Sequence, residues 1–331
     1  MSYIKAPLSA GTLLVRDAFP PVVRLASDKS LPRLDAWEVV PGDHVGKTEW
    51  ARIISIPRPL DSTRPFAYVY LQANGHIIYE VSIKIYGVLG RHNFDIFGNW
   101  NGQSDGGPRA MQFLHLEAGP YGDLFREQAQ CLVDIKALII STLRSRNLTS
   151  AEYEELRNRH TTSISMNRRV FTKIDRVDNP PPSVITAMDD PAGRLQVLGP
   201  AWRVVDKPSF GRRLATGRVK TCASALFRPG DFVCANARFD IAVPRKDPFG
   251  VPTVSPHLFF THVVQLCPEA NTIEEMQFPA PALAANVPLP VTMLSTPMLF
   301  DGDDDMDTQE SEATDEEVQE HQHSGKRPDG T

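Results

Sequence analysis

Residues 194–220 form the most chemically distinctive stretch of the sequence. Seven of them are basic and only Asp206 is acidic, so the stretch has a net charge of +6, with Trp202 and Phe210 among the cations. Proteins that bind single-stranded nucleic acid combine Lys and Arg along the phosphates with aromatic side chains that stack on the bases. The sequence therefore predicts a single-stranded nucleic-acid site made by Arg203, Lys207, Phe210, Arg212, Arg213, Arg218 and Lys220.

The same charges have a second interpretation, in which no nucleic acid is bound. Charged side chains on an edge strand keep sheets from pairing with one another, so a solvated basic edge needs no phosphate partner. The protein would then be an interaction scaffold whose main partner is another protein. A second basic set adds little, because Glu152, Glu154, Glu155 and Asp175 dilute it; its members are Arg144, Arg146, Arg157, Arg159, Arg168, Arg169, Lys173 and Arg176.

Residues 42–48 resemble a phosphate-binding loop at their end, where Gly46, Lys47 and Thr48 follow one another. Such a loop needs a glycine five residues before Gly46, and here that position falls on Pro41. Proline removes a backbone N–H and fixes φ, which does not suit a nest of amides around a phosphate. We therefore expect no nucleotide at this loop, but a turn that leads into a strand over residues 49–56.

Three cysteines and two histidines in the C-terminal half lack the spacing of a zinc site. Structural zinc sites draw ligands from close pairs such as Cys-x-x-Cys, and none is present. On a regular strand, His257 and His262 are five residues apart and would point to opposite faces. The sequence predicts no metal and no cofactor. It also contains no Gly-x-Ser-x-Gly elbow or comparable nucleophile motif, and we favour a non-catalytic protein.

The last 31 residues carry most of the negative charge. Twelve acidic and two basic residues give positions 301–331 a net charge of −10, while the other 300 residues, with 33 basic and 28 acidic side chains, have a net charge of +5. Such a segment buries too little apolar surface to fold alone. We expect a Pro-rich linker and disordered acidic tail over residues 278–331. A calcium loop is not favoured at residues 301–312, because Met306 occupies the position of the required glycine.

Composition excludes a membrane-spanning protein, since no run approaches the roughly 18 apolar residues that a transmembrane helix needs. The four cysteines, Cys131, Cys222, Cys234 and Cys267, are widely spaced and typical of reduced thiols. We expect an intracellular protein, nuclear or cytoplasmic, with no membrane partner.

The elements in the first half include a β-hairpin and two helices. Alternating runs flank Asn74-Gly75, whose residues tolerate positive φ, and counting outwards pairs Tyr70 with Tyr79, Tyr68 with Val81 and Phe66 with Ile83. We expect these aromatic side chains to lie in the core. Apolar residues at helical spacing predict one long helix over residues 122–147. Thr149 and Glu152 then form a capping box that starts a second helix ending near residue 160.

From residue 194 onward the pattern predicts strands again, at 195–198, 202–205, 218–227, 232–243 and 257–266. We expect a five-stranded barrel-like, OB-like module with Val204, Leu226, Val233, Ile241, Phe260 and Val264 inside. The predicted fold class is α+β. Its parts are a β module with two helices (1–176), a Pro-rich linker (177–183), the five-stranded module (184–277) and the linker with its tail (278–331).

One resemblance can be given for this C-terminal half. Residues 227–233 (FRPGDFV), 239–241 (FDI) and 262–266 (HVVQL) resemble a pattern in hypothetical proteins of mushroom-forming fungi. The resemblance implies a fungal source. It implies no activity and no site residue, because that group has no established function.

Overall fold

The computed structural model describes residues 2–3, 39–56, 66–71, 79–158, 162–174, 182–214, 218–242 and 254–268. Residues 1–300 and 301–331 form separate units, and all described residues lie in the first. The predicted linker and acidic tail at 278–331 therefore lie outside the described residues, as does the Asn74-Gly75 turn.

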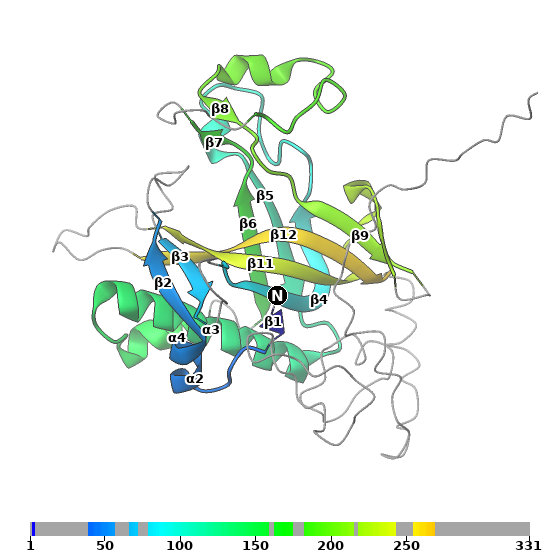
Figure 1. The fold of residues 1–331 in the computed structure, drawn as a ribbon. Helices are drawn as coiled ribbons and strands as arrows, with labels where there is room; N and C mark the ends of the chain where they lie inside the picture. Colours follow the sequence, from blue (N-terminus) through cyan, green and yellow to red (C-terminus); the bar gives the residue numbers. More distant parts are fainter. Residues whose placement is uncertain are drawn as a thin grey trace, which may run out of the picture. The chain divides into compact units, whose positions relative to one another are not determined.

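The fold of the described part is mixed α and β, with one large sheet (Figure 1). Ten strands form this sheet: β1 Ser2–Tyr3, β2 Ala51–Ser55, β3 Phe66–Tyr70, β4 Ser82–Asn93, β5 Met111–Glu117, β6 Ser163–Arg169, β9 Ser209–Arg213, β10 Val219–Thr221, β11 Phe232–Ala242 and β12 Ser255–Cys267. A second sheet pairs β7 Thr172–Lys173 with β8 Trp202–Arg203. The helices are α2 His44–Trp50, α3 Gly122–Arg144 and α4 Ser150–Asn158.

The main sheet joins strands that the sequence assigns to separate modules. Its order is β10-β9-β12-β11-β4-β5-β6, so β11 lies between β12 and β4, with Cys234 opposite Tyr86. Strands that precede residues 177–183 in the sequence and strands that follow them are thus hydrogen-bonded in one sheet. The prediction of a separate five-stranded OB-like barrel is wrong, because the described strands form no closed barrel and the long β11–β12 pair completes a sheet begun by β4.

Two predicted C-terminal strands are confirmed almost residue for residue, namely β11 and β12. Residues 194–198 instead form a 3₁₀ helix, because Gly193 and Gly199 adopt positive φ (63° and 68°) and turn the chain at each end. Residues 224–226 form another 3₁₀ helix, which leaves Leu226 52 % exposed, so its predicted place in the core is wrong. The other five predicted core residues are buried: Val204, Val233, Ile241, Phe260 and Val264.

The predicted hairpin register is confirmed close to the turn. Tyr70 N donates to Tyr79 O at 3.1 Å, and Val81 N donates to Tyr68 O at 2.8 Å. Further from the turn the strands separate, and Phe66 lies opposite Ile241 of β11 rather than opposite Ile83. Tyr68 and Tyr70 are core residues as predicted, whereas Tyr79 is 53 % exposed.

Helix α3 is the predicted long helix, and it ends at Ser145, which has a left-handed φ of 53°. Its buried side contributes to the core and includes two polar residues, Gln128 and Lys136. The Gln128 amide accepts from Tyr86 N (2.9 Å) and donates to Tyr86 O (2.7 Å), so it satisfies two backbone groups of β4 as a neighbouring strand would. Among the described residues, no helix is long and apolar enough to span a bilayer.

The capping box of α4 is confirmed: Thr149 N donates to Glu152 Oε2 at 2.8 Å, and Glu152 N donates to Thr149 Oγ1 at 3.3 Å. The prediction of a turn over residues 42–48 and a strand from residue 49 is wrong for residues 44–50, which form helix α2. Asp43 caps this helix by accepting from Gly46 N at 2.7 Å. The predicted strand follows as β2.

Candidate functional site

Strands β9 and β10 form a short antiparallel hairpin that carries four of the predicted site residues. Lys220 lies directly opposite Arg212, and Val219 lies opposite Arg213. Arg218 is placed next to them, because its carbonyl accepts from Leu214 N at 2.8 Å. We call Arg212, Arg213, Arg218 and Lys220 the cationic hairpin. In the sheet order, β10 is the end strand on this side.

The cationic hairpin has no acidic residue of its own, since none occurs between residues 207 and 221. Among the described residues, the side chains of Arg212, Arg213 and Lys220 make no hydrogen bond or ion pair. Arg212 and Lys220 are exposed. Like charges directly opposite each other destabilise an antiparallel pair. Arg212, Arg213 and Lys220 therefore present positive charge that no described side chain neutralises.

The other three predicted site residues make different contacts, although Phe210 also belongs to β9. Arg203 belongs to β8 and lies opposite Thr172 in the small sheet. Lys207 pairs with Asp189, with Nζ 2.7 Å from Oδ2. Phe210 is half-buried in an aromatic cluster, where its ring centroid is 4.9 Å from that of Phe94. Four of the seven predicted residues thus lie together on the hairpin, whereas tertiary contacts engage Lys207 and Phe210. That the seven residues bind nucleic acid stays a prediction.

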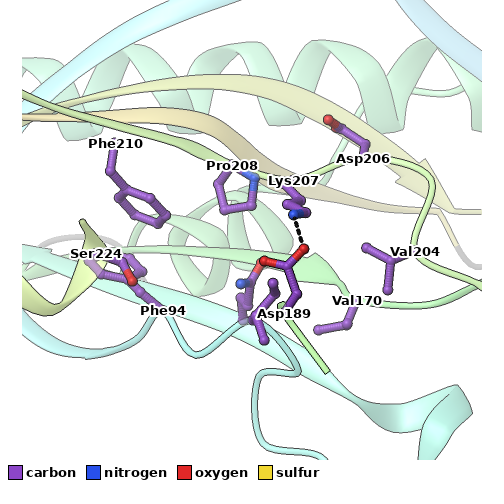
Figure 2. A pocket seen from close by; sticks show the side chains of 11 residues that line it. Phe94, Val170, Asp189, Val204, Asp206, Lys207, Pro208, Phe210 and Ser224 are labelled. Atoms are coloured by element: carbon purple, nitrogen blue, oxygen red, sulfur yellow. Dashed lines mark hydrogen bonds and ion pairs between the residues drawn. The ribbon is translucent and has the colours of Figure 1, made fainter. Parts of the chain in front are cut away.

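Lys207 and Phe210 instead line a pocket of about 180 Å³ next to the start of β9 (Figure 2). The pocket lies where the main core meets a smaller cluster built around Phe97, Phe171 and Val204. Its apolar lining comes from Phe94, Ile96, Val170, Val204, Pro208 and Phe210. Its polar lining comes from Gln112, Asp189, Asp206, Lys207 and Ser224.

The carboxylate of Asp189 is fixed by a local turn. Thr186 N and Thr186 Oγ1 both donate to Asp189 Oδ2, at 2.8 and 2.9 Å, and Lys207 donates to the same oxygen. The Lys207 ammonium and these hydrogen bonds lower the pKa of Asp189 to about 2. The Asp189 carboxylate therefore stays charged at neutral pH, next to Lys207.

Asp206, the other carboxylate of the pocket, is paired with Arg168, a buried residue that does not itself line the pocket. Arg168 is 2 % exposed, and its Nη2 lies 3.3 Å from Asp206 Oδ2 and donates to Asp206 O at 2.9 Å. Burial lowers the pKa of Arg168 to about 10, which leaves it charged at neutral pH. Both pocket carboxylates are thus neutralised by protein cations.

Two polar groups of the pocket lack a partner among the described residues. Gln112 is 4 % exposed, and its Nε2 donates to Asp95 O at 2.8 Å, while its carbonyl Oε1 accepts no hydrogen bond. The Ser224 hydroxyl also makes none. Sequence reasoning missed Gln112, Asp189 and Ser224. The Thr-x-x-Asp spacing at 186–189 was the one local signal that could have indicated the fixed carboxylate.

Other candidate chemistry is not supported by the geometry. Lys47 is buried, and its Nζ donates to Gly42 O at 2.8 Å and lies 3.4 Å from Asp134, so it is engaged within the protein. An irregularity in β12 sets His257 opposite Asp240 and His262 opposite Asn236, which puts the two histidines on one face, contrary to the prediction. Even so, the described residues contain no group of three metal-ligating side chains.

A scan against protein-family models and searches of curated proteins and of solved structures gave no match. The resemblance of residues 227–266 to fungal hypothetical proteins stays a prediction. Functional inference consequently depends on the hairpin and the pocket themselves.

Proposed function

We propose that this protein binds single-stranded nucleic acid without catalysis, through contacts between the cationic hairpin and the phosphates. The observation that carries this proposal is the placement of Lys220 opposite Arg212, with Arg213 and Arg218 beside them and no acidic residue in the hairpin. A phosphate backbone supplies regularly spaced negative charges, which would relieve the repulsion between these cations.

Binding of this kind has a measurable salt dependence. If all four cations contact phosphates, log K falls against log salt with a slope of about −3 for a single strand. The affinity then decreases about 50-fold between 50 and 200 mM salt. Little base selectivity comes from the phosphate contacts themselves.

The experiment measures fluorescence anisotropy of a labelled 12-nucleotide single strand at several salt concentrations. We expect the double variant R212A/K220A to bind more weakly at 50 mM salt and to show a slope of about −1.4, because two contacts are lost. The matched control is R109A/R126A, which removes two exposed cations paired with Asp105 and Asp123. It should bind like the wild type.

Two outcomes would overturn the proposal: no binding by the wild type at 50 mM salt, or equal losses in the double variant and its control. The hairpin charges would then serve to protect the edge of the sheet, and the scaffold interpretation would take the place of nucleic-acid binding.

A further inference from the structure

We infer that the pocket beside the cationic hairpin accepts one pyrimidine-sized base of the bound strand, an inference that rests on the proposed function. Strand β9 connects the two sites. Phe210 lines the pocket, and Arg212 follows two residues later on the same face, about 7 Å along the strand. This spacing lets Arg212 hold a phosphate while the base of the same nucleotide enters the pocket.

The size of the pocket limits what can enter. An apolar cavity of about 150 Å³ holds one benzene molecule. At about 180 Å³, this pocket has room for one six-membered ring with small substituents. A purine, with its two fused rings, is longer and fits this volume less closely. A single pyrimidine ring matches it.

The lining matches the two kinds of surface that a base presents. Figure 2 shows Phe94 and Phe210 on one side of the Lys207–Asp189 pair, and Val170 and Val204 on the other. Aromatic and apolar side chains suit the flat faces of a base, which stack without regard to sequence.

Polar groups in the pocket suit the edge of a pyrimidine. Gln112 is 4 % exposed, and its Oε1 has no donor among the described residues, so an N–H of the base would supply one. Lys207 donates to one carboxylate oxygen and retains donors for a ring carbonyl, while the Ser224 hydroxyl can donate or accept. Since both carboxylates are already paired with cations, the pocket favours an uncharged ring.

The test compares binding of dT12 and dA12 by the full-length wild type and two variants of the 3₁₀ segment Ser224–Leu226. S224F places a ring at the pocket, whereas the matched control A225F changes a neighbouring exposed residue that does not line it. We expect the wild type to favour dT12 about tenfold, as one base–pocket contact would give. S224F should lose this preference but keep its affinity for dA12, and A225F should keep both.

The possible failures can be told apart. Equal wild-type affinities for dT12 and dA12, with the salt dependence intact, overturn the pocket inference and leave the proposed function in place. A thymine preference that survives in S224F also overturns it, since the preference then arises from the stacking of the strands themselves. If neither strand binds at 50 mM salt, the proposed function fails and the pocket inference fails with it. Thermal unfolding of each variant verifies that it is folded.

Discussion

Two arginine-rich regions of this molecule use their charge in opposite ways. At the corner between α3 and α4, Arg144 and Arg146 both contact Glu152, with nitrogen–oxygen distances of 3.0 and 2.8 Å. In the cationic hairpin, Arg212 and Lys220 oppose each other without an acidic neighbour. The corner uses its charge to hold two helices together, whereas the charges of Arg212, Arg213 and Lys220 in the hairpin have no partner among the described residues. Basic composition is similar in both, so the placement of carboxylates separates structural charge from charge that can bind a ligand.

The corner should show the largest effect on stability when its carboxylate is neutralised. Glu152 closes the capping box and accepts from both arginines, so E152Q removes the charge partner of Arg144, whose side chain is 19 % exposed. We expect the free energy of unfolding to fall by about 1–2 kcal/mol. The control E154Q breaks an exposed pair with Arg157 and should cost only a few tenths of a kcal/mol.

The pH dependence of the stability difference between wild type and E152Q follows from the direction in which the pKa of Glu152 is shifted. Hydrogen bonds from Arg146 and Thr149 hold the pKa of Glu152 well below its ordinary value of 4.5. A carboxylate of this kind stabilises the fold fully above its unfolded pKa and loses that contribution as the pH falls toward its folded pKa. Urea unfolding from pH 7 down to pH 3 should therefore show wild type and E152Q converging below about pH 4.5. A constant difference across this range contradicts the assignment.

A smaller effect is expected when the hairpin is made to resemble the corner. R212E creates an opposite-charge pair with Lys220, whereas R212Q only removes the repulsion. R212E should be more stable than R212Q by about 0.2–1 kcal/mol, a difference that high salt reduces. Chemical denaturation at 50 mM and 1 M salt measures this difference. If the two variants are equally stable at low salt, the side chains at 212 and 220 do not interact across the hairpin.

Local signals made much of the fold predictable. The Thr149–Glu152 box, the period of α3 and the alternation of β11 and β12 all depend on residues close in sequence. Strand order depends instead on contacts between distant residues, and no local pattern indicates that β11 pairs with β4. The site divides in the same way. Arg212 and Lys220 are near in sequence, and the count of basic residues predicted both. The ion pair between Lys207 and Asp189 joins residues 18 positions apart, and a local count of charges does not indicate it.

The smallest expected effect concerns the acidic segment 301–331, which has a net charge of −10. We expect it to compete with phosphates for the same cations. Deleting it should raise the affinity for a single strand about two- to fivefold at 50 mM salt. The gain should shrink at 200 mM, because charges are screened beyond roughly 7 Å at that ionic strength. Anisotropy titrations of full-length and truncated proteins measure the effect.

In the R212A/K220A background the same deletion should give a smaller gain, since part of the attraction is already gone. Equal affinities of full-length and truncated proteins at every salt concentration exclude the competition. If the gain in affinity is undiminished in the double variant, the acidic segment competes at basic residues other than Arg212 and Lys220.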